Sequence, residues 1–428
     1  MIGFAALSHL GLVSSAAIAA RGFPTVAFDP DPALVAAIVA GRLPVREPGL
    51  RELIAQARPA FTADVTALSA CDVVYVALDV PTDDVGQSDL GPLEKLIDLI
   101  WPHVRRDATL VVLSQVSPGF TRRLESRRAR SADEPGGVYY QVETLIFGSA
   151  VQRAQQPERY MVGCADPVKP LPPAFRDELE AFGCPILPMR YESAELAKIS
   201  INLFLVSSIS TTNMLAELCE RIGADWSEIA PALRLDARIG PKAYLTPGLG
   251  IGGGNLGRDL ETVKRLSNAH GTDTRIVDAW RINSTYRCDW ALRLLHETVL
   301  ADRPDAVLAL WGFAYKPHTA STKNSPAVSL LGSLGPHRVT VYDPAAQLER
   351  ARFPQAVQAS DALSAARGAD VLLVMTPWPE FWSVPLDALQ QAMRGRTIID
   401  PYSALDGAGA RALGFTWRCL GAPAPAEF

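Results

Sequence analysis

Ile2-Gly3-Phe4-Ala5-Ala6-Leu7-Ser8-His9-Leu10-Gly11 opens the chain with an apolar run that gives way, at Ser8, to an alanine-rich stretch. An apolar run as short as Ile2–Leu7 is typical of a strand buried on both faces of a parallel sheet. His9–Ala20 has the composition of a helix, and a second apolar run, Pro24–Asp29, follows it. This order of strand, helix and strand predicts a βαβ unit.

The alternation continues through the first third of the chain. A helix is predicted at Pro32–Ala40, and buried strands are predicted at Asp72–Leu78 and Thr109–Leu113. Strands that alternate with helices at this spacing favour a parallel, doubly wound sheet.

A long helix is predicted in the middle of the chain. Glu192–Gly223 contains no proline and no glycine before its last residue, and its apolar residues recur at steps of three and four. Shorter helices are predicted at Trp226–Leu235, Leu260–Ala269 and Thr272–Leu300. Part of the apolar stripe is expected to be core. A helical middle region favours a domain spacer and a subunit interface.

A second alternating block occupies the C-terminal part. Its predicted strands are Ala306–Trp311, Arg338–Tyr342, Val371–Met375 and Thr397–Asp400, separated by helices near Pro326–Ser333, Ser360–Arg367 and Leu386–Met393. The predicted fold class is α/β, with two doubly wound, Rossmann-like domains joined by a long central helix and a helical spacer. We place the domains at 1–190, 191–301 and 302–428, since 428 residues are too many for one core.

The composition narrows the functional classes. A net charge of -5 without a long basic run gives no support for a nucleic-acid surface. The six cysteines are scattered and form no CxxC pair, which fits reduced thiols in a cytoplasm. No metal site is predicted.

The first twenty residues are apolar enough to resemble a signal peptide. No basic residue precedes their apolar part, however, and Arg21 comes only after it. A strand followed by a buried helix is therefore favoured. No later run reaches the ~18 uninterrupted apolar residues of a membrane-spanning helix. We expect a cytoplasmic protein without membrane contact.

Dinucleotide-binding domains usually carry G-x-G-x-x-G between the first strand and the first helix. The corresponding stretch is Ala6-Leu7-Ser8-His9-Leu10-Gly11, where only the third glycine, Gly11, remains. Ser8 stands where backbone would approach the pyrophosphate. Ser8, Leu10 and Gly11 are candidate cofactor residues, and a Rossmann-like domain without a dinucleotide is the alternative.

Asp29 ends the second predicted strand, where an acid would bind the adenosine ribose hydroxyls. An acid at this position prefers NAD, since it repels the extra phosphate of NADP. The alternative interpretation is a plain turn, because aspartate and proline, as in Asp29-Pro30-Asp31-Pro32, favour turns whether or not a cofactor binds. The spacing favours the cofactor interpretation, so the predicted cofactor is NAD.

Several motifs follow one another along nearly the whole chain. They are Glu47-Pro48-Gly49-Leu50, Gln141-Val142-Glu143-Thr144-Leu145-Ile146-Phe147-Gly148, the helix of Glu192–Asp225, Arg238-Ile239-Gly240-Pro241-Lys242, and Tyr315-Lys316-Pro317. In this order they resemble the motifs of the UDP-glucose/GDP-mannose dehydrogenase family of nucleotide-sugar dehydrogenases. The resemblance implies that the C-terminal block binds the nucleotide part of a sugar nucleotide.

Gly248-Leu249-Gly250-Ile251-Gly252-Gly253-Gly254-Asn255-Leu256-Gly257-Arg258-Asp259 resembles the active-site loop of that family. The family carries a nucleophilic cysteine where this chain has Asn255. A thiolate can hold an aldehyde as a thiohemiacetal for a second oxidation, and a carboxamide cannot. If the rest of the site is intact, the protein should remove one hydride rather than two.

The resemblance also implies the other catalytic residues. Glu143 matches an acid-base glutamate, and Asp259 matches an aspartate that polarises water. Lys198 and Asn202, four residues apart on one helix face, match the pair that holds the reacting oxygen and the catalytic water. Taken alone, each is also compatible with a solvated surface position.

Further residues are assigned by the same resemblance. The implied cofactor contacts are Thr82, Gln115, Arg258 and Lys323, and the implied substrate contacts are Thr144, Leu145, Arg238, Tyr244, Gly252 and Lys316. Arg238 resembles an arginine that reaches into a neighbouring subunit, so at least a dimer is expected. Phe147 and Tyr402 depart from the family, which has glutamate and arginine there, and an altered substrate is an open alternative.

The leading interpretation is an NAD-dependent oxidoreductase of a nucleotide sugar or related metabolite. It would carry out a two-electron alcohol oxidation, either net or transient as in epimerisation. The alternatives are full oxidation to the acid without a thioester, and a catalytically inactive protein that binds a sugar nucleotide.

Overall fold

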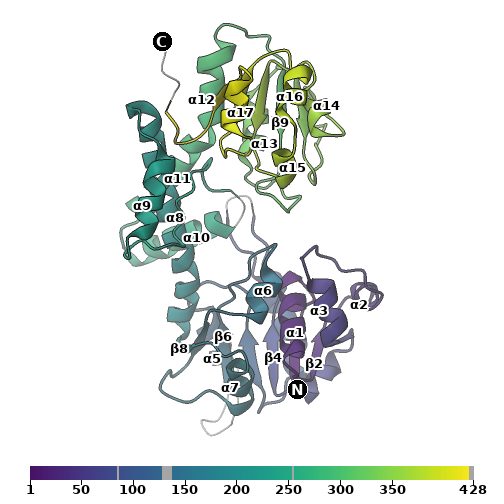
Figure 1. The fold of residues 1–428 in the computed structure, drawn as a ribbon. Helices are drawn as coiled ribbons and strands as arrows, with labels where there is room; N and C mark the ends of the chain where they lie inside the picture. Colours follow the sequence, from purple (N-terminus) through teal and green to yellow (C-terminus); the bar gives the residue numbers. More distant parts are fainter. Residues whose placement is uncertain (84–85, 128–136, 253–254, 424–428) are drawn as a thin grey trace. The chain divides into compact units, whose positions relative to one another are not determined.

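The computed structural model describes residues 1–83, 86–127, 137–252 and 255–423. The chain divides into two compact units, Met1–Ile201 and Asn202–Phe428. Each unit carries its own sheet (Figure 1).

The first unit is built on an eight-stranded sheet of order β3-β2-β1-β4-β5-β6-β7-β8. Its strands are β1 (Ile2–Ala5), β2 (Thr25–Phe28), β3 (Ala60–Thr62), β4 (Val73–Val76), β5 (Thr109–Val112), β6 (Gly137–Gln141), β7 (Tyr160–Cys164) and β8 (Ile186–Arg190). The described strand pairs are parallel except β6 with β7, which is antiparallel. Because β1 lies between β2 and β4, the chain changes direction across the sheet at β1, which is where open α/β sheets bind ligands.

Helices cover both faces of this sheet. They are α1 (His9–Ala20), α2 (Pro32–Val39), α3 (Leu50–Ala57), α4 (Gly91–Ile100), α5 (Phe120–Arg127), α6 (Ala150–Gln155) and α7 (Pro173–Glu180), with short 3₁₀ turns at Val65–Ala70 and Trp101–His103. One core contains buried residues of α1, α3, α6 and α7, and the other contains buried residues of α4, α5 and the beginning of α8. The two cores confirm a doubly wound sheet.

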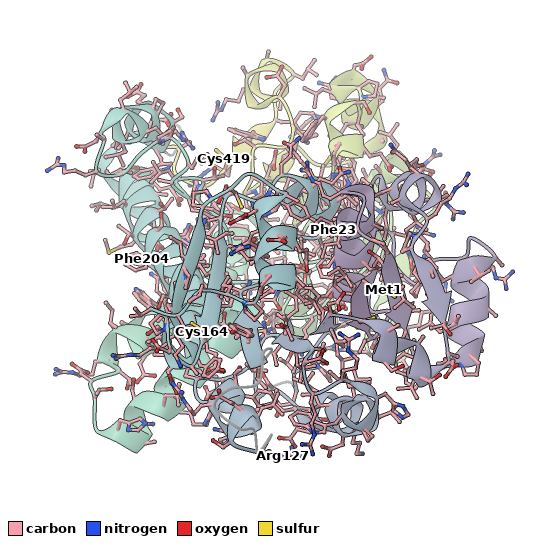
Figure 2. All side chains as sticks on the ribbon, turned by 90° about the horizontal axis from the view of Figure 1, so that it is seen from below. Met1, Phe23, Arg127, Cys164, Phe204 and Cys419 are labelled. Carbon is pink, nitrogen blue, oxygen red and sulfur yellow. The ribbon has the colours of Figure 1, made fainter. Side chains whose placement is uncertain are left out.

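The long helix α8 (Tyr191–Ile222) contains the boundary between the two units. By length and composition it could cross a membrane, a test that core helices of soluble proteins also pass. Phe204, a residue of α8 labelled in Figure 2, is 79% exposed. Met214, Leu218 and Ile222 are exposed as well, at four-residue steps. This helix therefore has an uncovered apolar stripe in the single chain.

The second unit contains a six-stranded parallel sheet of order β11-β10-β9-β12-β13-β14. Its strands are β9 (Leu308–Trp311), β10 (Val339–Tyr342), β11 (Ala356–Gln358), β12 (Val371–Val374), β13 (Thr397–Ile399) and β14 (Thr416–Arg418). Its helices are α9 (Trp226–Leu235), α10 (Asn255–His270), α11 (Arg275–Cys288), α12 (Trp290–Leu295), α13 (Pro326–Ser333), α14 (Ala362–Ala366), α15 (Pro379–Trp382), α16 (Leu386–Ala392) and α17 (Gly407–Ala412), with a π-helical turn at His296–Leu300. The predicted second Rossmann-like sheet is confirmed.

Two helix predictions were wrong in their bounds. The helix predicted at Leu260–Ala269 begins at Asn255, so the last five residues of the glycine-rich motif, Asn255–Asp259, are helical. Thr272–Leu300 is not continuous, because it begins at Arg275 and breaks at Asp289. Aspartate competes for backbone hydrogen bonds and is a weak helix former, which favours a break there.

Candidate functional site

The candidate cofactor residues of the first unit follow the carboxyl ends of neighbouring strands. Ser8 and Gly11 follow β1, Asp29 follows β2, Thr82 follows β4 and Gln115 follows β5. Since parallel strands end at one edge of a sheet, these residues share the edge at which a dinucleotide fold binds its ligand.

The altered glycine motif keeps the backbone that the motif normally specifies. Ala6, at the position of the first glycine, has a left-handed φ of 83°. Gly11 packs so closely on the end of β1 that a Cβ there would lie 2.0 Å from the Ala6 carbonyl oxygen. The third glycine is thus required by space, whereas the first has been replaced at a cost in backbone strain.

Ser8, at the position of the second glycine, is the N-cap of α1. Its hydroxyl donates to the Ala77 carbonyl at 2.7 Å and accepts from the Gly11 amide at 3.5 Å. The side chain of Leu10 is 5% exposed, so only its backbone amide could serve a ligand. The amides of the first turn of a helix attract anions, and this turn fits the pyrophosphate of a dinucleotide.

Asp29 closes the predicted turn and also contacts the loop after β1. Its carboxylate accepts hydrogen bonds from the amides of Leu7, at 2.8 Å, and Asp31, at 3.0 Å. The first bond fixes the acid against the loop after β1, and the second closes a turn. Each carboxylate oxygen can accept a further bond, so the residues of this edge fit NAD.

Glu143 and Lys198 form an ion pair in the first unit. The Lys198 ammonium lies 3.5 Å from Glu143 Oε2 and donates to the Glu143 carbonyl at 2.7 Å. Glu143 Oε1 accepts from the Leu145 amide, and Arg153 holds the Thr144 carbonyl at 2.7 Å. These bonds fix the segment from Glu143 to Leu145 beside a mostly buried cation.

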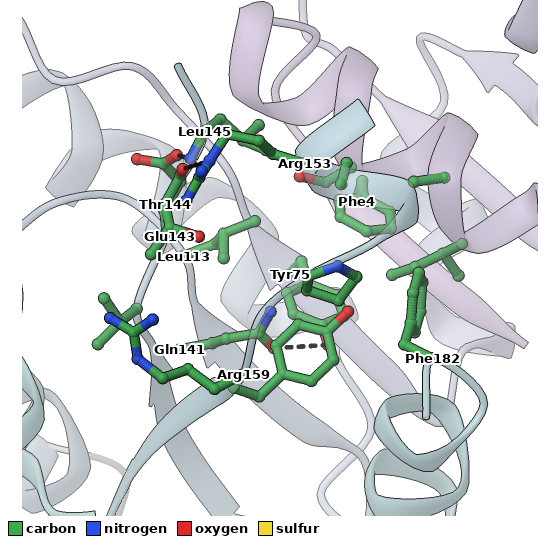
Figure 3. A pocket seen from close by; sticks show the side chains of 17 residues that line it. Phe4, Tyr75, Leu113, Gln141, Glu143, Thr144, Leu145, Arg153, Arg159 and Phe182 are labelled. Atoms are coloured by element: carbon green, nitrogen blue, oxygen red, sulfur yellow. Dashed lines mark hydrogen bonds between the residues drawn. The ribbon is translucent and has the colours of Figure 1, made fainter. Parts of the chain in front are cut away.

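A cavity of about 50 Å³ lies against this segment (Figure 3). The Tyr75 hydroxyl borders it and contacts Gln141 Oε1 at 3.1 Å and Glu178 Oε1 at 2.8 Å. Burial raises the pKa of Glu178 to about 8. Sequence inspection did not single out Glu178, since one acid in an amphipathic helix gives no signal of burial.

In the second unit, the Asp259 carboxylate is almost inaccessible. Asn202 donates its side-chain amide to Asp259 Oδ2 at 2.5 Å, and Arg258 Nε lies 3.5 Å from Asp259 Oδ1. Arg258 is itself buried. Three residues predicted to act at the site are thus brought together.

Asn255 is exposed and is the first residue of α10, so Asp259 follows it by one helical turn. Gly253 and Gly254 of the predicted loop lie outside the described residues. The preceding segment is held by Asn213, which accepts from the Gly248 amide at 2.8 Å, and by Ser284, which accepts from the Ile251 amide at 2.7 Å.

Cys288 is a thiol beside this segment that sequence inspection did not assign to the site. Its Sγ donates to the Leu249 carbonyl at 3.1 Å. Burial raises the pKa of Cys288 to about 11. Because the thiolate is the nucleophilic form, the raised pKa makes Cys288 a poor nucleophile near neutral pH.

The other candidate residues of the second unit lie in different surroundings. Arg238 is highly exposed and pairs with Asp236 at 2.6 Å, and Tyr244 is 47% exposed. The Lys316 ammonium lies 5.6 Å from the centre of the Tyr315 ring, which also packs near Gly252. The backbone amide of Lys323 donates to the Ser321 hydroxyl at 3.4 Å.

Tyr402 acts on the same glycine-rich segment. Its ring lies 3.7 Å from the position that a Cβ on Gly248 would take, and its hydroxyl is hydrogen-bonded to the Leu249 backbone. Burial raises the pKa of Tyr402 to about 12. Tyr402 therefore supports the segment as a neutral group.

Three family models match the chain. They describe the UDP-glucose/GDP-mannose dehydrogenase family, with the NAD binding domain at residues 1–172, the central domain at 192–285 and the UDP binding domain at 309–407.

Curated relatives match over almost their whole length. UDP-glucose 6-dehydrogenase AglM of Haloferax volcanii is 32% identical over 409 residues, covering 92% of this chain and 94% of the relative. UDP-glucose 6-dehydrogenase TuaD of Bacillus subtilis is 29% identical over 430 residues, covering 97% and 92%.

Solved structures share the fold. A UDP-glucose dehydrogenase from Pyrobaculum islandicum has a TM-score of 0.82 at 26% identity, covering 99% of this chain and 96% of that one. A UDP-D-ManNAc dehydrogenase from Pyrococcus horikoshii has a TM-score of 0.82 at 22% identity, covering 98% and 99%, a likeness of fold alone.

Proposed function

The chain belongs to the UDP-glucose/GDP-mannose dehydrogenase family, and we propose that it oxidises an alcohol of a nucleotide sugar by removing a single hydride. The family and its relatives make the protein an NAD-dependent oxidoreductase. The proposal that one hydride is removed rather than two rests on Asn255 in the glycine-rich loop of this chain.

The proposal is carried by Asn255, an exposed carboxamide at the start of α10, at the position where the motif resemblance implies that the family has its nucleophile. An amide does not form the thiohemiacetal that prepares an aldehyde for a second hydride transfer. The neighbouring thiol of Cys288 stays protonated because burial raises its pKa. The first oxidation needs no thiol, and the residues that the resemblance assigns to it, Glu143, Lys198, Asn202 and Asp259, are present in the chain.

The chemistry of the retained groups suits that first step. Removing a hydride from the carbinol carbon and a proton from its hydroxyl leaves a carbonyl. NAD, when bound, supplies the hydride acceptor. We assign the proton to the Glu143 carboxylate, and stabilisation of the developing oxyanion to the Lys198 ammonium.

Asn202 and Asp259 complete the assignment. An amide has two N–H donors, and Asn202 uses one of them on Asp259. Its second donor is assigned to the reacting oxygen, since Lys198 and Asn202 occupy consecutive turns of α8. Asp259 fixes the orientation of that amide.

A UDP-sugar is the proposed substrate class, because the relatives are UDP-glucose 6-dehydrogenases and the C-terminal match is to a UDP binding domain. Thr144, Leu145, Arg238, Tyr244, Gly252 and Lys316 are proposed to contact it. The proposed cofactor contacts are Thr82, Gln115, Arg258 and Lys323.

We also propose that the protein is a cytoplasmic homodimer, and that its domains are 1–190, 191–301 and 302–428.

The stoichiometry of NADH tests the proposal. The protein is incubated with NAD and UDP-glucose, and NADH is counted against the sugar nucleotide consumed, with products identified by mass spectrometry. We expect one NADH and an aldehyde for each molecule consumed. Two NADH with a carboxylate would contradict the single hydride, and inversion of a sugar carbon without net NADH would identify a transient oxidation.

A further inference from the structure

The Glu47 carboxylate joins separate segments of the first unit. Glu47 Oε1 accepts from the Ala150 amide at 2.8 Å, and Oε2 accepts from the Gly148 amide at 3.0 Å. Oε2 also lies 3.0 Å from His9 Nε2. The Glu47 side chain is fully buried, so these partners replace water around its charge.

A ring contact closes the same junction. Phe147 stacks on His9, with ring centres 4.1 Å apart and planes 23° from parallel. His9 is 5% exposed and Phe147 is 52% exposed, so Phe147 forms the outer layer of the stack. The segment before α6 is therefore attached to α1 by a shared carboxylate and by a pair of rings.

The two attached parts have different tasks in the proposed reaction. His9 is the first residue of α1, in the turn that fits the pyrophosphate of NAD. The segment from Glu143 to Gly148 carries the acid paired with Lys198. An anion bound at the start of α1 places negative charge close to His9. His9 in turn contacts the Glu47 carboxylate directly.

We propose that Glu47 is a positioning residue that transmits the binding of NAD at α1 to the segment Glu143–Ala150. Cofactor and nucleotide sugar then bind cooperatively, and each raises the affinity for the other by the same factor. The effect on binding of the nucleotide sugar, which we call the sugar half of the proposal, rests on the proposed function. The effect of NAD on the segment Glu143–Ala150, the cofactor half, rests only on the contacts of the first unit.

Hydrogen exchange tests the cofactor half without any substrate. Exchange of the Gly148 and Ala150 amides is measured with and without NADH in wild type, in Glu47→Gln and in the control Glu52→Gln. Glu52 is an exposed acid in α3, so its variant changes charge alone. We expect NADH to slow exchange at least several-fold in wild type and in the control, and to leave it unchanged in Glu47→Gln.

The change caused by NADH is the decisive quantity. A merely structural role for Glu47 would raise the basal exchange rate and still allow NADH to slow it. Persistence of that slowing in a folded Glu47→Gln protein would overturn the proposal. If Glu47→Gln does not fold, His9→Phe keeps an aromatic ring against Phe147 and both backbone bonds to Glu47, and it removes only the contact between α1 and the Glu47 carboxylate. It is then expected to lose the response to NADH, and a retained response would contradict the proposal.

Calorimetry tests the sugar half. UDP-glucose is titrated into protein with and without saturating NADH, a combination that does not turn over. We expect NADH to raise the affinity about fivefold or more in wild type, within the usual range of coupling between sites. The factor should approach one in Glu47→Gln, while NADH binds within threefold of wild type. Equal coupling in both proteins would overturn this half, whereas failure of UDP-glucose to bind would count against the proposed substrate and leave the exchange result standing.

Discussion

The side-chain amide of Asn202 donates to the Asp259 carboxylate over 2.5 Å, which ties the long helix α8 to the second turn of α10. Asp259 is only 1% exposed. A buried carboxylate needs such donors, and loss of one leaves part of its charge unsatisfied. The pair therefore has both a structural role and a proposed catalytic role.

Replacing Asn202 should separate these roles. We expect Asn202→Ala to lower kcat about 10²- to 10³-fold, as loss of one donor to an oxyanion typically does. Its free energy of unfolding should fall by roughly 1–3 kcal/mol. Initial rates with NAD and UDP-glucose, together with thermal unfolding, measure both effects. Asn268→Ala removes an exposed amide of α10 and should change neither. An unchanged kcat in Asn202→Ala would remove Asn202 from the mechanism.

Restoring a thiol at position 255 should extend the reaction. Asn255 begins α10, and a cysteine at a helix N-terminus has a lowered pKa. We expect Asn255→Cys to convert part of the aldehyde to carboxylate, with more than one NADH for each sugar nucleotide. Mass spectrometry of the product and of a thiol-bound intermediate provides the measurement. Carboxylate formed by wild type at the same rate would show that position 255 does not limit the reaction to one hydride.

Asp29 should select the cofactor. Because its carboxylate would face the extra phosphate of NADP, we expect calorimetry to show at least about tenfold tighter binding of NADH than of NADPH, or roughly 1.4 kcal/mol. Asp29→Asn keeps an acceptor for the Leu7 amide and should reduce the preference. Equal affinities in wild type would contradict the role of Asp29.

Glu178 should make stability depend on pH. Its pKa is about 8 in the folded protein, above its ordinary value near 4.5, so the folded state holds the proton more tightly. The stability contributed by this proton is complete below pH 4.5 and is lost as the pH rises through 8. We expect Tm to fall between pH 5 and 8, and to fall less in Glu178→Gln. Glu180→Gln, at an exposed position of the same helix, should behave like wild type. The same Tm profile in all three proteins would refute the raised pKa.

The apolar stripe of α8 should form a subunit interface. Phe204, at 79% exposure, is a large apolar side chain uncovered in the single chain. We expect a dimer by light scattering at micromolar concentration, and a shift toward monomer in Phe204→Glu, because a buried unpaired charge opposes association. Val168→Glu, at a 91% exposed position, should leave the dimer intact. A monomeric wild type would end this interpretation.

Sequence patterns were sufficient for some elements of the core but not for all, since the fully buried strand β7 was not predicted. Apolar runs predicted β1, β4 and β5, and His9–Ala20, Trp226–Leu235 and Pro326–Ser333 have the predicted bounds. Edge strands gave weaker signals. β3 is short and partly exposed, and β8 contains Pro188, which a central strand would not tolerate.

The candidate site shows a similar limit. Motifs named Glu143, Lys198, Asn202 and Asp259, and the structure pairs Glu143 with Lys198 and Asn202 with Asp259. The supports of the glycine-rich segment were missed, because Ser284 and Cys288 approach it from 33 and 39 residues away in the chain. Such contacts arise from packing and leave no local periodicity.

The loop between β1 and α1 distinguishes two kinds of constraint on a glycine. At position 6 the constraint is conformational, and alanine adopts the left-handed backbone at a cost of roughly 1–2 kcal/mol. At position 11 the constraint is volume, since a methyl group would overlap a carbonyl oxygen. Mutational drift can therefore erase the first glycine of such a motif long before the third. Surveys of genomes that require the full pattern will overlook dinucleotide folds like this one, whereas a search anchored on the sterically fixed glycine would retain them.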